Sequence, residues 1–413
     1  MNKAILQRKL VIKIPRRSYD KNSFLFAAMF FLPIINGFLN EIFLSIGIPS
    51  ISSFVYFFIY LLSFYICFVA IVLNYRKTLG LFIFVVSFIL IQITFHSEVF
   101  YVLFNFSGGL SSIALSNFFL LFFLGLSMIF IGQCLDSSCQ RQLELYCKVF
   151  SYIVVALYII TMLLHLKSSS RFNYMTIAYN ALPALLIITY CAFVEKKPVA
   201  KALFFASTAF IFIGGCRGAL LQLSIAIIIL FLINDGTAIT AKKMFIIIMA
   251  LFISFIIYIN FNQIIIAIGQ LLNTIGFKSR IINMFLGTSM EGTVFHFDDR
   301  SEIYKLTIPE ISFLGKGIFI YVDGVGYPHN IIVEFLLGYG IIFGSILFIG
   351  LIILVIRSYR RVKIINDRFL LIIWVSAFTT IFIKMMVSAS YLTDRAFWFY
   401  LAFMLYIIRF RRT

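Results

Sequence analysis

Two arginines in this sequence are placed where a bound anion would stabilise them. Arg217 lies within the sequence GGCRG at positions 214–218, between two apolar runs, and stands at the start of the second run. A cation at the N-terminus of a helix opposes the helix dipole unless an anion lies between them. Arg300 has the same position in a short predicted helix, where the anion would be either a bound phosphate or the neighbouring Asp298 and Asp299.

A third arginine, Arg171, follows a run of serines just beyond another apolar segment. The guanidinium group presents forked donors that match the oxygens of a phosphate. Three arginines that face the same membrane surface would therefore suit a pyrophosphate. The alternative is that each arginine braces a loop or extends its charged end toward the membrane interface.

A second group of polar residues comprises His329, Asn330 and Glu334, which follow Pro328 at the beginning of a long apolar run. Asn330 and Glu334 are four residues apart, so a helix would place them on the same side. An acid near the top of a membrane helix is costly unless it has a partner. A histidine titrates near neutral pH and is a reasonable general base for a sugar hydroxyl. The spacing leaves open whether His329 and Glu334 act in catalysis or pin the loop to the helices.

The elements that must position these residues are membrane helices. The chain has 413 residues, of which 62% are hydrophobic and 12% charged, and its mean hydropathy is +1.05. A soluble domain carries about 25% charged residues, and a spanning helix needs about 20 mostly apolar residues. The apolar runs are continuous and do not alternate, which favours helices over a barrel. We therefore predict an all-α polytopic membrane protein with about twelve transmembrane helices, at residues 24–45, 52–74, 79–96, 113–132, 148–166, 176–194, 200–215, 219–234, 244–268, 330–356, 369–388 and 396–409.

The basic residues give this single membrane domain, residues 1–413, an orientation. The net charge of +18 comes from lysines and arginines clustered between apolar runs, which is typical of cytoplasmic anchors and not of a nucleic-acid-binding protein. We expect cytoplasmic N- and C-termini, with a basic segment at 1–23 and a short tail at 410–413. All four histidines and the three arginines then fall on the outer side.

The longest predicted loop, residues 269–329, is external and carries short helices. It is rich in glycine but contains apolar residues throughout, so we expect it to fold back onto the bundle. Within it, Asp299 to Pro309 is predicted as a helix, with Asp299 as its cap and Glu302 at the third helical position.

Several classes of enzyme are excluded by missing motifs. The chain has no Walker loop, no dinucleotide-binding glycine fingerprint, no HExxH and no CxxC pair. Cys134, Cys139 and Cys147 lie close together but lack the tighter pairs and the histidine or carboxylate ligands that a metal site would need. We expect no metal and no cofactor.

The order of these motifs resembles the O-antigen polymerase and O-antigen ligase superfamily of bacterial envelope proteins. The resemblance covers mainly residues 165–350. It rests on Arg171-x-Asn173, Gly215-Cys216-Arg217-Gly218, Arg300-x-x-x-Tyr304, Gly315-x-Gly317, and His329-Asn330-x-x-x-Glu334 followed by Gly338, Gly340 and Gly344.

The resemblance implies an inner-membrane glycosyltransferase that uses polyprenyl-pyrophosphate-linked sugars on the periplasmic face, without an essential metal. Arg171, Arg217 and Arg300 would bind the donor pyrophosphate and stabilise it as the leaving group. His329 would orient or deprotonate the acceptor hydroxyl, and Glu334 would assist by holding His329. The supporting residues would be Asn330, Tyr304 and Asp299. Expected partners are the lipid-linked oligosaccharide, membrane lipid, and a chain-length regulator and a flippase of the same pathway.

Two departures from the commoner pattern bear on the activity. Cys216 stands where a serine often precedes the arginine, and the glycines after His329-Asn330 do not have the spacing of the ligases. The second departure favours a polymerase that builds O-antigen, other lipopolysaccharide glycan or capsule. A ligase that transfers glycan to lipid A-core remains an alternative, as does a transporter of lipid-linked oligosaccharide.

Overall fold

The computed structural model describes residues 21–48, 75–96, 125–166, 174–213, 216–233, 260–274, 298–318, 328–387 and 389–410, with a few isolated positions between 58 and 72. Within these ranges all regular secondary structure is helical, which confirms the predicted all-α class. The predicted spans at 52–74, 113–132 and 244–268 lie wholly or largely outside the described residues.

The described helices overlap most of the predicted spans, but the helix predicted at 148–166 begins eight residues earlier, at Gln140, and the one predicted at 330–356 ends nine residues later, at Ile365. Their bounds are α1 (Lys21–Ser45), α3 (Tyr75–Phe95), α6 (Ser127–Gln133), α7 (Gln140–Leu166), α8 (Tyr174–Phe193), α9 (Pro198–Ile213), α10 (Arg217–Ile233), α12 (Phe261–Thr274), α14 (Asp298–Thr307), α15 (Ile331–Ile365), α16 (Arg368–Thr379), α17 (Met385–Val387) and α18 (Arg395–Arg409). Short 3₁₀ turns occupy Ser137–Cys139 and Ile308–Glu310 (η3), and a π-helical turn, η4, occupies Thr380–Lys384. The predicted start of the external loop at residue 269 falls inside α12.

Four segments of the described chain are long and apolar enough to cross a membrane: Lys21–Ser45, Ser137–His165, Met175–Phe193 and Ile331–Ile365. Three shorter apolar helices accompany them, at Thr78–Gln92, Pro198–Ile213 and Gly218–Ile233. A helical membrane protein is therefore supported, whereas the predicted number of twelve spans stays a prediction.

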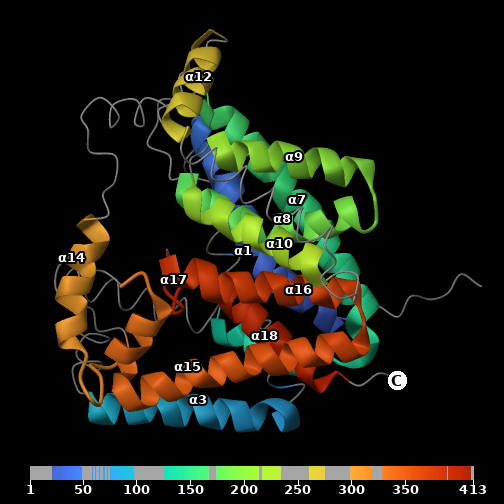
Figure 1. The fold of residues 1–413 in the computed structure, drawn as a ribbon. Helices are drawn as coiled ribbons and strands as arrows, with labels where there is room; N and C mark the ends of the chain where they lie inside the picture. Colours follow the sequence, from blue (N-terminus) through green and yellow to red (C-terminus); the bar gives the residue numbers. More distant parts are fainter. Residues whose placement is uncertain are drawn as a thin grey trace, which may run out of the picture.

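Aromatic side chains fill the centre of the bundle. Phe26 and Phe30 of α1 stack on Phe399 of α18, with ring centroids 5.0 and 4.1 Å apart. All three rings are fully buried. Figure 1 shows α1 passing through the bundle, with α8, α9 and α10 on one side and α15, α16 and α18 on the other. Helix α3 runs along the outside of α15.

The helix termini lie at two opposite ends of the bundle. Helices α1 and α7 run parallel, because Ser23 donates to the carbonyl of Cys139 (3.2 Å) at their starts, whereas Glu41 lies 3.7 Å from His165 near their ends. We call the first of these the basic end; it comprises residues 21–23, 134–148, 194–201, 357–368 and 409–410. The opposite, distal end carries Glu41, His165, His329 and residues 389–394. In Figure 1 the basic end lies on the side of the marked C-terminus and the distal end on the side of α14 and α17.

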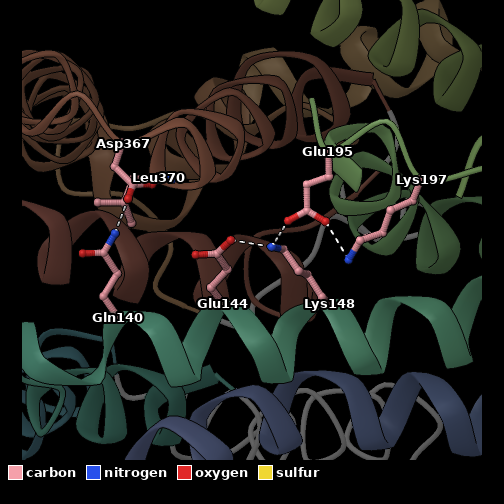
Figure 2. Close-up of polar contacts among 7 residues, drawn as sticks. All are labelled: Gln140, Glu144, Lys148, Glu195, Lys197, Asp367 and Leu370. Carbon is pink, nitrogen blue, oxygen red and sulfur yellow. Dashed lines mark hydrogen bonds and ion pairs between the residues drawn. The ribbon is translucent and has the colours of Figure 1, made fainter. Parts of the chain in front are cut away.

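Ion pairs hold the basic end together (Figure 2). Lys148 of α7 lies between Glu144 and Glu195, and Lys197 contacts the other oxygen of Glu195 at 2.8 Å. Burial would raise the pKa of Glu195, but its hydrogen bonds to Lys148 and Lys197 outweigh that effect and hold the pKa below its ordinary value. The α8–α9 turn is thereby fixed to α7.

A second contact in the same region fixes α15 and α16. Gln140, the first residue of α7, donates to one oxygen of Asp367. The other oxygen of Asp367 accepts from the amide of Leu370 (2.9 Å) and so caps α16. The two turns of the basic end are therefore both attached to α7, and the helices that leave them are aligned toward the distal end.

Candidate functional site

The site begins with a break in α15 at the distal end. Gly340 has a φ of +78° and a ψ of 173°, so it interrupts the helix and divides it into residues 331–339 and 341–365. A Cβ on Gly344 would lie only 2.5 Å from the carbonyl oxygen of Phe335. In a straight helix these residues would be separated by about 13 Å along the axis. The short first part of α15 therefore bends back sharply on the long part.

The loop that follows α14 fills this break. The amide of Lys316 donates to the carbonyl of Leu337 (2.8 Å), and the amide of Gly317 donates to the carbonyl of Gly338 (3.0 Å). On the other side of the break, the amide of Ile341 donates to Ser312 (3.2 Å). These bonds satisfy backbone groups that the interruption of the helix would otherwise leave unpaired. Residues 312–317, which belong to the predicted external loop, therefore pack against α15, whereas the rest of that loop stays a prediction.

Two glycines make that close contact possible. A Cβ on Gly340 would lie 2.2 Å from the carbonyl oxygen of Phe313, and a Cβ on Gly315 would lie 2.4 Å from the amide nitrogen of Gly340. Both residues also have positive φ, which side chains disfavour. The separate glycine motifs of the sequence thus belong to one structural feature, which the spacing alone did not reveal.

His329 and Asn330 form the entry to α15. Asn330 is the N-cap, and its side-chain oxygen accepts from the amides of Ile332 (2.9 Å) and Val333 (3.4 Å). Its role is therefore structural at this helix start. His329 immediately precedes it with a φ of +53° and is half-buried. A non-glycine residue in this left-handed conformation carries a steric cost of about 1 kcal/mol or more, so the surrounding structure fixes the direction in which the imidazole leaves the backbone.

Glu334 is held by the turn between α17 and α18. The residue is only 6% exposed. Ser390 donates its hydroxyl hydrogen to one carboxylate oxygen, and the amide of Tyr391 donates to the other at 3.3 Å. We expected Glu334 to hold His329. The structure shows that each carboxylate oxygen accepts a hydrogen bond from residues 390–391, because that turn crosses over the first turn of α15; the contact with His329 stays a prediction.

The same turn carries residues that the sequence analysis did not select. Asp394 forms an ion pair with Lys384, and its other oxygen caps α18 through the amide of Phe397 (2.9 Å). The Lys384 ammonium lies 5.3 Å from the ring centroid of Tyr179. Tyr391 donates to the hydroxyl of Tyr339 at 2.7 Å. The sequence did offer a signal for these residues, since charged and hydroxyl-bearing side chains gather at the outer end of a predicted span.

The turn that contains Arg217 lies near this cluster. Cys216, in that turn, is buried. Gln222, in the second turn of α10, donates to Thr380 (3.1 Å) at the start of η4. Arg217 is the first residue of α10, as predicted, so its position relative to the helix dipole is as expected.

For the other residues of the predicted anion site, the structure gives the position of the α14 residues but not that of Arg171. Helix α14 begins at Asp298, so Asp299 lies inside the helix and not at the cap position, while Arg300 lies in its first turn. Tyr304 is half-buried on α14. η3, which follows α14 and contains Pro309, packs against α15. Arg171 lies outside the described residues.

The described chain therefore places His329, Asn330 and Glu334 at the start of α15, and the loop after the Arg300 helix packs into the break of the same helix at Gly340. Such a site could orient a hydroxyl group beside His329, while arginines at the starts of α10 and α14 would provide positive charge at the same end of the bundle.

Comparison with models of known protein families, with curated proteins and with solved structures finds no match for this chain.

Proposed function

We propose that the chain is a glycosyltransferase that joins polyprenyl-pyrophosphate-linked oligosaccharide repeat units into O-antigen or capsular polysaccharide. It would act at the outer face of a bacterial inner membrane, with both termini in the cytoplasm. One observation supports this proposal most directly: the loop that follows the Arg300 helix is packed into the break of α15, the helix that follows His329 and carries Glu334 in its first turn. The Gly315-x-Gly317 motif and the glycines that follow Glu334 are therefore in direct backbone contact.

The proposed reaction is a displacement at the anomeric carbon of the donor sugar. The acceptor hydroxyl oxygen forms the new glycosidic bond while the bond to the pyrophosphate oxygen breaks, and the polyprenyl pyrophosphate leaves with the electron pair. His329 takes the hydroxyl proton. Arg171, Arg217 and Arg300 stabilise the negative charge on the leaving group. Glu334 does not react; it fixes the first turn of α15 through Ser390 and Tyr391 and so positions His329.

A transporter of lipid-linked oligosaccharide is the second candidate, because discontinuous helices are common at the substrate sites of transporters. The break in α15 is such a discontinuity. Against this reading, the polar residues of the site gather at one end of the bundle, whereas transporter sites lie near the middle of the membrane. A ligase would use nearly the same catalytic groups as a polymerase and would differ in its acceptor.

The test is the glycan profile of a deletion strain, measured by gel electrophoresis and mass spectrometry. A polymerase predicts that single repeat units are still attached but that longer chains are lost. Long chains that accumulate on the lipid carrier would indicate a ligase. Repeat units trapped on the cytoplasmic side would indicate a transporter and would contradict the catalytic role of His329.

A further inference from the structure

The long part of α15 has two faces. Leu351, Val355, Ser358 and Val362 are buried against the bundle. At 100° per residue these positions fall within one narrow arc. The opposite arc is exposed along its whole length.

The exposed face changes its chemistry at residue 357. Up to that point it consists of large apolar side chains, including Ile349 (54% exposed), Ile353 (44%) and Ile356 (46%). Isoleucines exposed in this number along a helix that can span a membrane are expected to contact lipid. The next exposed positions on the same arc are Arg357, Arg360 and Lys363, which we call the α15 basic stripe.

The α15 basic stripe has no acidic partner among the residues that the structure describes. Nearby cations that point toward the bundle are engaged: Arg361 donates to the carbonyl of Phe410 (3.0 Å), and Lys148 and Lys197 pair with glutamates. Asp367, the acid closest in sequence, accepts from Gln140 and Leu370. The three cations of the stripe form no hydrogen bond or ion pair with any described residue.

An isoleucine distinguishes the expected ligand from a soluble anion. Ile364 follows Lys363 on the same arc and is 68% exposed. A large apolar side chain next to cations is typical of the boundary between lipid headgroups and acyl chains. A surface that binds a water-soluble anion would not need it.

We propose that the α15 basic stripe is a binding surface for the phosphate groups of anionic phospholipids. The exposed isoleucines that precede residue 357 contact the acyl chains. Arg357, Arg360 and Lys363 contact the phosphates at the headgroup level. The two guanidinium groups supply forked donors for phosphate oxygens. This inference does not depend on the proposed enzymatic function.

The test uses the full-length protein in nanodiscs that contain phosphatidylcholine with increasing fractions of phosphatidylglycerol. The variant Arg357→Gln/Arg360→Gln/Lys363→Gln removes the stripe. The control Arg141→Gln/Lys196→Gln/Lys201→Gln removes three exposed cations from the same end of the bundle, so the change in net charge is equal. Retained lipids are counted by native mass spectrometry after mild detergent exchange, and thermal unfolding is followed in each nanodisc.

The wild type and the control should retain phosphatidylglycerol in preference to phosphatidylcholine, and their thermal midpoints should rise with the anionic fraction. The stripe variant should bind phosphatidylglycerol more weakly by roughly fivefold per cation removed. Its thermal midpoint should no longer increase with the fraction of phosphatidylglycerol. Equal loss in the two triple variants would overturn the proposal, because it would indicate a diffuse attraction. Unchanged retention in the stripe variant would overturn it as well. Cysteine labelling of Met290→Cys in cells checks that the stripe variant keeps the wild-type topology. A loss of lipid binding then cannot result from incorrect insertion into the membrane.

Discussion

The hydroxyl of Ser390 donates to the carboxylate of Glu334, a residue 56 positions earlier in the chain. This bond fixes the turn before α18 against the first turn of α15, and it determines the direction in which the segment with His329 and Asn330 enters the site. The fold thus uses a buried acid to connect two helix ends.

Replacing Ser390 with alanine should therefore destabilise the protein. The buried Glu334 carboxylate would lose a donor, which costs about 1–3 kcal/mol, and the site would loosen. The measurement is thermal unfolding in detergent, together with the length of the glycan chains. Ser358→Ala is a matched control, because Ser358 is equally buried but donates only to Val355 in its own helix (2.9 Å). Equal effects of the two substitutions would mean that the Glu334 contact has no special role.

Gly340→Ala should be among the most damaging small substitutions in α15. The new Cβ would collide with the carbonyl of Phe313, and the positive φ would be strained, so we expect a loss of roughly 2 kcal/mol or more in stability. Gly350→Ala is the control, since a Cβ there meets nothing within 4 Å. Thermal midpoints of the two variants measure the difference. A Gly340→Ala protein as stable as Gly350→Ala would contradict the observed break.

Lys384→Met should destabilise the protein by about 3–5 kcal/mol, because it leaves the carboxylate of Asp394 buried without its partner. The double variant Lys384→Met/Asp394→Asn should recover much of that loss, since asparagine is neutral and still accepts at the N-cap of α18. A double-mutant cycle from chemical denaturation measures the coupling. Simple additivity of the two changes would show that the ion pair does not couple them.

The contacts of Glu195 predict a dependence of stability on pH. Its pKa is lowered in the folded protein relative to its ordinary value of 4.5. Its contribution to stability is therefore fully present above that value and is lost as the pH falls through the lower, folded value. Unfolding curves between about pH 6 and pH 3 should show this loss, and Glu195→Gln should reduce it. A pH profile that is identical in Glu195→Gln would assign the acid sensitivity to other carboxylates.

Arg217→Ala and Arg300→Ala should abolish polymer while the protein remains in the membrane. Lysine at either position should rescue poorly, because an ammonium lacks the fork that matches two phosphate oxygens. Arg368→Ala, which alters an exposed arginine at the basic end, should leave the polymer unchanged. The glycan profile and the membrane-bound amount of each variant are the measurements. Normal chain lengths in both alanine variants would contradict the anion-binding role of these arginines.

Much of the local structure follows directly from the order of residues. The apolar runs determine where α1, α7, α8, α10, α16 and α18 lie, since a continuous apolar segment can bury its backbone only as a helix. The helix start at Arg217 and the end of α14 near Pro309 were also predictable. Each depends on neighbouring residues alone: glycine permits the turn, and proline lacks the amide donor of a regular helix and therefore favours a helix end.

The arrangement of the site was decided by tertiary structure. Nothing in the spacing of Gly315, Gly338 and Gly340 indicates that residues 312–317 would enter a break in α15, because that contact forms between backbone groups far apart in the chain. The partner of Glu334 could not be inferred for the same reason: a buried carboxylate must find a donor, but any hydroxyl or amide can supply it. The sequence determined which groups need partners, and the packing of the helices determined which partners they found.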